Sequence, residues 1–236
     1  MQAIILAGGR GTRLKQVVPD VPKPMAEING TPFLALLISY LSQQEITRII
    51  LSVGHQYQKI VDYFGDSYQG VEIAYTIEEQ PLGTGGAIKL ALETTESVDP
   101  VFVLNGDTFC QLNFKEMYGN FHDSGKTFGI ALTEVENSSR FGSVQLSSDR
   151  SGINNFTEKR HSSGSGLINS GVYLLYKNFF EQFNFGEKFS FENDCLYPHV
   201  SRIDCFPYVY DGKFIDIGIP EDFEKAQHFL SFIQIR

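Results

Sequence analysis

Short apolar runs alternate with helix-patterned segments through the first half of the chain. Residues 3–7 (AIILA) form a continuous apolar run, which is typical of a strand buried on both faces. Residues 33–43 instead carry apolar side chains three and four positions apart, the spacing of one face of an α-helix. The same reasoning predicts, in chain order, a strand over 48–53, a helix over 58–64, a strand over 71–77, a helix over 84–94 and a strand over 101–104. This alternation predicts an α/β fold: a doubly wound, mostly parallel Rossmann-like sheet with helices on both faces.

The second half of the chain has a less regular pattern, in which β-rich runs are separated by glycine and serine. The predicted elements are strands over 128–134, 143–146, 153–158, 172–175 and 206–210, and a final helix over 221–232. Pro220 suits the first turn of that helix, where an N–H group is not needed. We expect the strands to extend the sheet and to build a lobe for a substrate. Residues 162–166 (SSGSG) read as a loop within one domain and not as a linker between two.

Composition and charge narrow the functional classes. With 236 residues and 42% hydrophobic content, the chain suits one domain with a large core. Its net charge is −9 and its 19 Lys and Arg residues are scattered, so DNA and RNA are not expected partners. Three cysteines without CxxC spacing argue against a disulfide framework or a structural zinc site. The apolar run at 3–7 is too short for a signal peptide or a membrane span, so we expect a cytoplasmic protein.

A glycine-rich segment, LAGGRGTRL (6–14), directly follows the first predicted strand. Glycines there allow backbone N–H groups to approach an anion, and Arg10 and Arg13 add positive charge, so the segment predicts a phosphate site. The alternative is a tight turn with exposed arginines. Leu14 stands where a dinucleotide fingerprint needs its third glycine, and no acidic residue ends the second strand at 53–55. No segment matches a P-loop either, so nicotinamide enzymes and P-loop kinases are both disfavoured.

Four ordered segments, LAGGRGTRL (6–14), PKPM (22–25), EQPLGTGGA (79–87) and NGD (105–107), closely resemble the sugar-1-phosphate nucleotidyltransferases. The resemblance extends over about the whole chain. It implies the nucleotide-diphospho-sugar transferase fold in a single domain, 1–236, with a nucleotide-binding half (1–110) and a sugar-phosphate-binding half (111–236).

Within this family, the sequences of four segments are most similar to the D-glycero-α-D-manno-heptose 1-phosphate guanylyltransferases. The segments are PKPM, EQPLGTGGAI, VFVLNGDTF and FIDIGIPEDFEKAQ. GTP is then the implied donor and the heptose 1-phosphate the implied acceptor. The nucleotide-sugar would serve capsule or other surface polysaccharide synthesis.

The resemblance also implies a catalytic group of three residues: Arg13, Lys23 and Asp107. Arg13, with Arg10 beside it, would hold the β- and γ-phosphates. Lys23, between two prolines, would bridge the sugar phosphate and the α-phosphate, although such a lysine could also be a solvated side chain in a turn. Asp107 follows a buried strand and Gly106, which should place its carboxylate at the ligand edge of the sheet. Asp107 and Asp216 would together hold Mg²⁺, unless Asp216 only caps the next turn.

The remaining implied site residues fall into two sets. Those for the nucleotide are Leu6, Ala7, Gly8, Gly9, Arg10, Gly11, Thr12, Glu79, Gln80, Pro81, Gly83, Thr84, Gly85, Asn105 and Gly106. Gln80 and Glu79 are candidates for contacts with the base, and the glycines around them could equally begin a helix. Those for the sugar phosphate are Gly142, Glu158, Lys159, Asn169 and Asp216. Glu158 and Lys159 could otherwise be a surface charge pair.

Two alternatives to this function stay open at the level of sequence. The chain could use UTP, CTP or dTTP with a mannose, glucose or N-acetylmuramic acid phosphate, which would leave the fold and the metal site unchanged. It could also be an inactive nucleotide-sugar sensor or regulatory subunit that keeps the pocket. A homodimer is plausible, yet no self-complementary patch is visible in the sequence.

Overall fold

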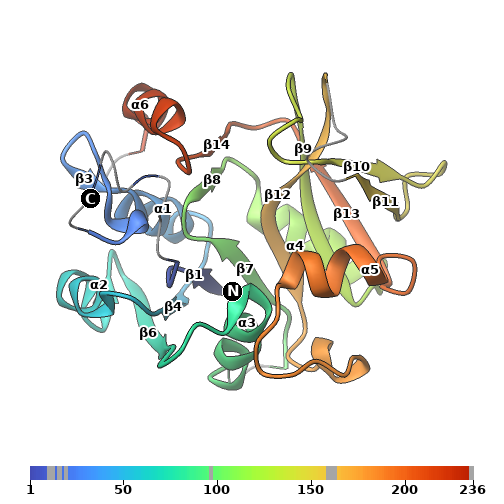
Figure 1. The fold of residues 1–236 in the computed structure, drawn as a ribbon, viewed down its shortest axis with the longest axis horizontal. Helices are drawn as coiled ribbons and strands as arrows, with labels where there is room; N and C mark the ends of the chain where they lie inside the picture. Colours follow the sequence, from blue (N-terminus) through green and yellow to red (C-terminus); the bar gives the residue numbers. More distant parts are fainter. Residues whose placement is uncertain (10–13, 15–17, 19–20, 96–97, 158–163, 234–236) are drawn as a thin grey trace.

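The computed structural model describes residues 1–9, 14, 18, 21–95, 98–157 and 164–233. Within this part of the chain, eight strands form one sheet in the order β13-β9-β12-β7-β1-β4-β6-β5 (Figure 1). Their bounds are β1 Gln2–Leu6, β4 Arg48–Val53, β5 Ser67–Tyr68, β6 Val71–Ile77, β7 Val101–Asn105, β9 Phe128–Val135, β12 Gly166–Leu175 and β13 Cys205–Tyr210. The sheet therefore takes strands from both halves of the chain.

Most neighbouring strands in this sheet run parallel. β1 pairs in parallel with both β4 and β7, β4 with β6, and β13 with β9. β12 is antiparallel to both of its neighbours, and the short β5 is antiparallel to β6. The chain builds outward from β1 in two directions, first to β4 and later to β7, so a topological switch point lies between β1 and β7. The predicted α/β fold with a mostly parallel, doubly wound sheet is confirmed.

Helices cover both faces of the sheet, as the apolar runs predicted. Along β1, Ala3 and Ile5 pack with the buried side chains of α1 (Phe33–Ser42), α2 (Tyr57–Phe64) and α4 (Phe114–Ser124). Ile4, between them, points to the opposite face and packs with α3 (Gly83–Glu93). A strand whose successive side chains are all buried needs cover on both sides, which is why 3–7 reads as a continuous apolar run.

Shorter elements complete the fold. Three two-stranded sheets pair β2 (Glu27–Ile28) with β3 (Thr31–Pro32), β8 (Thr108–Cys110) with β14 (Phe214–Asp216), and β10 (Ser143–Leu146) with β11 (Ile153–Thr157). The remaining helical pieces are η1 (Lys23–Met25), η3 (Phe179–Gln182), η4 (Phe191–Leu196), α5 (Tyr197–His199) and α6 (Pro220–Phe229). None of the helices in the described part of the chain is both long and apolar enough to cross a bilayer.

The last helix returns to the N-terminal half. In Figure 1, α6 lies beside β3 and α1, far from the β10–β11 hairpin. The Asn29 backbone N–H donates to Gln227 Oε1 (2.8 Å), and Gln227 Nε2 donates to the Glu27 carbonyl (3.2 Å). This attachment brings β14, which directly precedes α6, against β8 at the edge of the central sheet.

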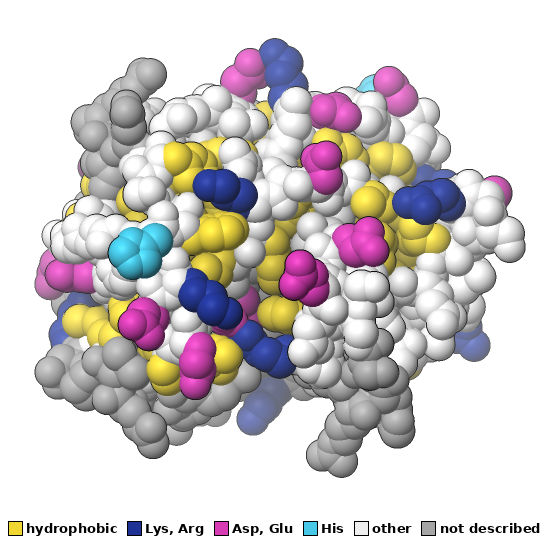
Figure 2. Space-filling model, turned by 90° about the horizontal axis from the view of Figure 1, so that it is seen from above, with side chains coloured by type: hydrophobic (Ala, Val, Ile, Leu, Met, Phe, Trp, Pro, Cys, Tyr) yellow, Lys and Arg dark blue, Asp and Glu magenta, His cyan; other side chains and the backbone are white. Residues whose placement is uncertain are grey.

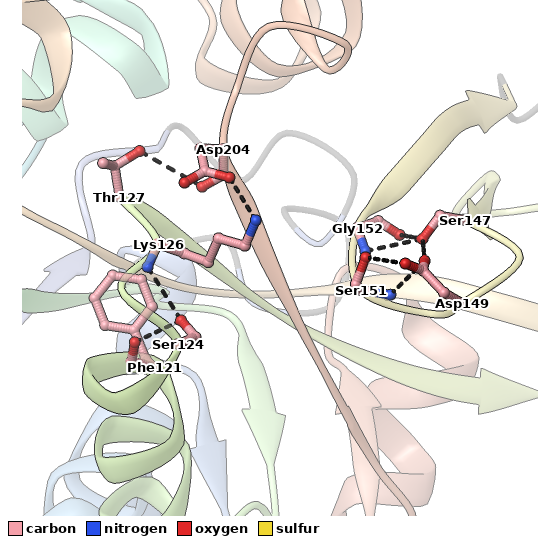
Figure 3. A network of polar contacts seen from close by, with 9 residues as sticks. All are labelled: Phe121, Ser124, Lys126, Thr127, Ser147, Asp149, Ser151, Gly152 and Asp204. Atoms are coloured by element: carbon pink, nitrogen blue, oxygen red, sulfur yellow. Dashed lines mark hydrogen bonds and ion pairs between the residues drawn. The ribbon is translucent and has the colours of Figure 1, made fainter.

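Two groups of polar contacts lie in the second half of the chain (Figure 3). Lys126 Nζ donates to Asp204 Oδ1 (2.6 Å), joining the starts of the parallel strands β9 and β13. In the β10–β11 turn, Asp149 accepts hydrogen bonds from the hydroxyls of Ser147 (2.6 Å) and Ser151 (2.8 Å). These donors lower the pKa of the Asp149 carboxyl to about 2.

Candidate active site

A cleft of about 1150 Å³ opens at the carboxyl ends of the central strands, across the switch point between β1 and β7. Its walls combine the residues after β1, β4, β6 and β7 with part of β12 and the start of η4. Seen from above, the molecule displays hydrophobic side chains between acidic and basic ones (Figure 2). A concave site in which several polar groups converge is typical of small-molecule binding.

The cleft collects many of the predicted site residues from distant parts of the chain. Those that line it are Leu6, Gly8, Gly9, Glu79, Pro81, Gly83, Thr84, Asn105, Asp107, Asn169 and Asp216. Ala7, Lys23, Gln80, Gly85, Gly106 and Gly142 are described but are not among its lining residues. Arg10, Gly11, Thr12, Arg13, Glu158 and Lys159 lie outside the described residues. The binding roles of all these residues stay predictions.

One lysine and two aspartates from three separate segments meet beside β7. Lys23 Nζ forms a short ion pair with Asp107 Oδ2 and lies 3.8 Å from Asp216 Oδ1. Lys23 begins η1, between Pro22 and Pro24, whereas Asp107 follows β7 and Asp216 ends β14. The antiparallel β8–β14 pair holds the two acids together, because Asp216 pairs with Thr108. The side chains are 10%, 35% and 25% exposed, so the cluster is partly shielded from water.

Hydrogen bonds orient both carboxylates. The Gly218 N–H donates to Asp216 Oδ1 (2.6 Å), and the Thr108 hydroxyl donates to Asp107 Oδ1 (3.2 Å). A Cβ on Gly218 would lie 2.7 Å from Asp216 Oδ1 and 3.0 Å from Lys23 Nζ, so a larger residue would oblige these side-chain ends to shift. Glycine at 218 therefore lets the cluster keep this close arrangement.

The cluster has more negative charge than positive. Burial raises the pKa of the Asp216 carboxyl, and the nearby Asp107 carboxylate raises it further, while Lys23 opposes both effects. Two carboxylates facing a single ammonium leave one negative charge unbalanced. A divalent cation would relieve that repulsion.

The donor chemistry of this site fits magnesium. Mg²⁺ prefers oxygen ligands and usually takes one or two carboxylates, with substrate phosphates and water completing its shell. Asp107 and Asp216 supply that number of carboxylates. Among the described residues there is no group of three or more His, Cys, Asp or Glu side chains placed to hold a metal. The geometry thus suits an ion bound jointly with substrate better than a site closed by protein ligands alone.

Backbone groups approach closely on the side of the cleft formed by the ends of β1, β6 and β7. Gly8 lies against Glu78, because a Cβ at position 8 would come within 2.7 Å of Glu78 Oε1. Glu78 Oε2 in turn accepts a hydrogen bond from the Leu82 N–H (2.9 Å), which holds the loop leading to α3. The Gly106 N–H donates to the Leu6 carbonyl (3.0 Å), joining the ends of β1 and β7. Residues 6–9 thus lie where β1, β6 and β7 end.

The glycines at the start of α3 have a packing role in this structure. The Gly85 N–H donates to the Phe189 carbonyl (3.0 Å), and a Cβ at position 85 would overlap the Phe189 ring. Gly86 lies against the Glu187 carbonyl, 2.2 Å from where a Cβ would be. Gly85 is accordingly turned toward the segment before η4, whereas Gly83 and Thr84 face the cleft.

Several cleft residues were not predicted from the sequence. Glu78, Phe141, Tyr173, Glu192, Tyr197 and Phe214 all line it. Asn169, which was predicted, donates from Nδ2 to the Tyr173 hydroxyl (2.8 Å) and to Glu192 Oε1 (3.2 Å). A polar residue such as Glu192 near the start of a helix looks like a surface residue in the sequence, so no signal there distinguishes it.

Comparisons with known proteins agree with this arrangement. The model of the nucleotidyl transferase family matches residues 2–231. A D-glycero-alpha-D-manno-heptose 1-phosphate guanylyltransferase of Campylobacter jejuni is 42% identical over 230 residues, covering 98% of this chain and 99% of the relative. A protein of the same name from Aneurinibacillus thermoaerophilus is 42% identical over 227 residues, covering 96% of this chain and 97% of the relative.

A solved structure extends the likeness to three dimensions. The crystal structure of HddC from Yersinia pseudotuberculosis superposes with a TM-score of 0.86 at 41% identity, covering 98% of this chain and 99% of HddC. HddC complexed with GMP-PN gives a TM-score of 0.85 at 40% identity, with the same coverage. The family model and these full-length matches lead to one conclusion. The chain belongs to the nucleotidyl transferase family.

Proposed function

We propose that this protein transfers the guanylyl group of GTP to D-glycero-α-D-manno-heptose 1-phosphate, giving the GDP-heptose and pyrophosphate. The names of its full-length relatives, at 42% identity, support this substrate pair. The complex of HddC with GMP-PN supports a guanine nucleotide as the donor. The observation that carries the proposal is that Asp107 and Asp216, which line a cleft at the switch point of the sheet, both lie against the Lys23 ammonium.

The reaction requires two anions to meet. An oxygen of the sugar phosphate attacks the α-phosphorus of GTP, and the bond from that phosphorus to the oxygen bridging the α- and β-phosphates breaks as pyrophosphate leaves. No protein nucleophile is needed, so alignment and neutralisation of charge are the main tasks. Lys23 supplies a fixed ammonium at this point, and its prolines restrict the backbone that carries it.

The two aspartates contribute by holding a cation at the same place. Asp107 and Asp216 would hold Mg²⁺, which supplies positive charge to the phosphates of the donor when bound. With Asp107 and Asp216 engaged by the cation, Lys23 would no longer be paired with them and would contact phosphate oxygens instead. Arg13 and Arg10 are proposed to act on the leaving pyrophosphate, as the resemblance of the opening segment implies.

Measurement of pyrophosphate release tests the substrate assignment. The enzyme is incubated with Mg²⁺ and each of GTP, UTP, CTP and dTTP, with the heptose 1-phosphate or α-D-mannose 1-phosphate as acceptor. We expect GTP with the heptose 1-phosphate to give a kcat/KM about 10-fold or more above every other pair. A higher kcat/KM with UTP, or with mannose 1-phosphate, would contradict the proposal while keeping the reaction class. Absence of pyrophosphate from every pair would favour a sensor or regulatory protein.

A further inference from the structure

A closed ring of hydrogen bonds holds one carboxylate in the wall of the cleft. The Tyr173 hydroxyl donates to Glu192 Oε1 (2.9 Å), and Asn169 Nδ2 donates both to that hydroxyl (2.8 Å) and to the same Oε1 (3.2 Å). All three side chains line the cleft. Every hydrogen bond in the ring is therefore accepted by Glu192 Oε1 or by the Tyr173 hydroxyl.

The members of the ring are themselves held in place. Asn169 Oδ1 accepts a hydrogen bond from the Gly171 N–H (2.9 Å), at the β-bulge of β12, which fixes the orientation of the amide. Tyr173 is 2% exposed, and burial together with the Glu192 carboxylate raises its pKa well above the usual range, so its hydroxyl stays a donor. These constraints leave Glu192 Oε1 with two well-placed donors.

The helix that carries Glu192 is anchored as well. The Phe191 N–H donates to the Thr84 hydroxyl (2.8 Å), and the Ser190 hydroxyl accepts from the Asn193 N–H (3.2 Å) at the start of η4. η4 is a turn of π-helix, a rare element that often occurs at functional sites. Glu192 is thus placed by its backbone and by its side-chain partners alike.

The second oxygen of this carboxylate is free to bind a ligand. Within the described residues, Glu192 Oε2 takes part in no hydrogen bond, and no Lys, Arg or His forms an ion pair with Glu192. A carboxylate accepts hydrogen bonds and repels phosphate, so its natural ligand is a neutral group with O–H or N–H donors. Phe191 and Tyr197, on the same segment, also line this wall and offer apolar ring surface.

Position favours the sugar over the nucleobase as that ligand. β12 lies next to β7 on the side away from β1, and residues 7–9, which follow β1, are on the other side of Asp107. The start of η4 is bonded to Thr84 at the start of α3, but the donors that hold the Glu192 carboxylate, Asn169 and Tyr173, both belong to β12. The acid pair lies between these two walls, where the sugar phosphate and the α-phosphate have to meet.

We propose that Glu192 accepts hydrogen bonds from hydroxyl groups of the sugar 1-phosphate and so selects for it, and that Asn169 and Tyr173 are positioning residues that hold its carboxylate. This inference rests on the proposed function, because it names a residue that binds the acceptor of that reaction. It also gives Asn169 a different part from the direct sugar contact predicted from the sequence.

Steady-state kinetics with the full-length enzyme test the inference. In Glu192→Gln, which keeps the size of the side chain, we expect the KM for the sugar 1-phosphate to rise about 10-fold, since hydrogen bonds to an ionised acceptor are roughly twice as strong as neutral ones. The KM for GTP should stay within about twofold, because uniform binding of the acceptor alone is lost. Glu187→Gln, the same change at an exposed glutamate of the neighbouring segment, should leave both constants unchanged.

A second variant tests the positioning role and covers the case in which Glu192→Gln does not fold. Tyr173→Phe removes only the hydroxyl, and we expect it to raise the KM for the sugar 1-phosphate about fivefold with a smaller effect on kcat. A rise in the KM for GTP alone, or unchanged constants in both variants, would overturn the inference. Wild-type enzyme that rejects the heptose 1-phosphate would refute the proposed function instead, and the variants would then be compared on whichever sugar 1-phosphate it accepts.

Discussion

At the scale of single residues, the central feature is a lysine shared by two aspartates. Lys23 neutralises one of the two charges of Asp107 and Asp216, and the pair is held together by the β8–β14 ladder. Thr108 and Gly218 orient the two carboxylates, and we propose that this arrangement holds a divalent cation. Each partner can therefore be tested by one small substitution.

Replacing Asp107 by Asn should remove activity and leave the fold intact. The amide has the shape of the carboxylate and lacks its charge, so the grip on Mg²⁺ and the alignment of the phosphates are lost. We expect kcat/KM to fall by about 10²-fold or more. Pyrophosphate release measures this change, with circular dichroism and thermal denaturation as controls for folding. An unchanged kcat/KM would remove Asp107 from the mechanism.

Adding one methyl group at Gly218 should disturb the cluster of Lys23, Asp107 and Asp216. The new Cβ would lie 2.7 Å from Asp216 Oδ1 and 3.0 Å from Lys23 Nζ, so at least one of these two side chains has to shift. We predict that Gly218→Ala raises the Mg²⁺ concentration needed for half-maximal activity by about 10-fold. Gly152→Ala, at a position where a Cβ meets nothing within 4 Å, should behave as wild type. Equal Mg²⁺ dependence of the two variants would argue against the close approach.

The sequence allowed Asp107 to be predicted from its place after a buried strand, since the topology of an α/β sheet puts such residues at the ligand edge. Asp216 was reached through the resemblance, and its closeness to Asp107 depends on α6 returning to the first half of the chain. Glu192 was missed because its place in the cleft wall depends on hydrogen bonds from Asn169 and Tyr173 of another element. Contacts of that kind leave no periodic pattern in the sequence.

At the scale of elements, the start of α3 shows how the two halves of the cleft are joined. Gly85 and Gly86 pack directly on residues 187–189, and the Thr84 hydroxyl accepts from the first residue of η4. Glycines in this segment had been interpreted as contacts for the nucleotide or as a helix start. In the structure they pack the start of α3 directly against the segment that leads into η4, so two walls of the cleft are in contact.

Gly86→Ala should therefore destabilise the protein, although alanine is the better helix former. Its Cβ would lie 2.2 Å from the Glu187 carbonyl, a backbone group that cannot rotate away. We expect the free energy of unfolding to fall by about 1–3 kcal/mol, the usual range for overpacking. Gly119→Ala, on the exposed side of α4 where a Cβ meets nothing within 4 Å, should raise it by up to about 1 kcal/mol. Urea denaturation measures both, and equal changes in the two variants would contradict this account of α3.

Strand bounds were predicted accurately where the hydrophobic pattern lies within the strand itself. The strands over 48–53 and 71–77 were predicted at their observed bounds, because their apolar pattern is complete within each run. For β12, only 172–175 was predicted, although the strand begins at Gly166. Residues 166–171 contain two glycines and a bulge, and they are strand only because β9 lies beside them.

The helix α4 was missed despite clear end signals. Its N-cap is Asn113, whose Oδ1 accepts from the Glu116 N–H (3.0 Å), and its C-cap is Gly125 in the left-handed conformation. Asn three residues before Glu, followed by glycine about ten residues later, is the cap pattern that could have located it. The hydrophobic stripe between these caps is narrow, with Phe114, Met117 and Phe121 as its buried residues.

At the scale of the whole molecule, an acidic protein with a charge of −9 handles anionic substrates at one preorganised point. The raised pKa of Asp216 makes that point sensitive to pH. Because the folded protein binds the proton of Asp216 more tightly than the unfolded chain does, this residue's contribution to stability is fully present below the ordinary aspartate pKa, about 3.9. It is lost as the pH rises through the raised folded-state pKa.

Magnesium should reverse that loss. We predict that Mg²⁺ raises the melting temperature more at pH 8 than at pH 5, since the ion binds the ionised carboxylates and stabilises the folded state that holds it. Asp216→Asn should reduce the difference between the two pH values. Thermal denaturation over a series of Mg²⁺ concentrations measures the effect. A Mg²⁺ shift that is equal at both pH values, or unchanged in Asp216→Asn, would place the metal elsewhere.

The most direct test of the account is phosphorus NMR of one reaction mixture. GTP, D-glycero-α-D-manno-heptose 1-phosphate, Mg²⁺ and the enzyme are combined, and the phosphorus signals are followed with time. We expect the signals of GTP and of the sugar phosphate to decline together. The signals of a sugar nucleoside diphosphate and of pyrophosphate should grow in equal amounts. A spectrum in which orthophosphate is released, or in which the sugar phosphate signal persists while GTP is consumed, would contradict it.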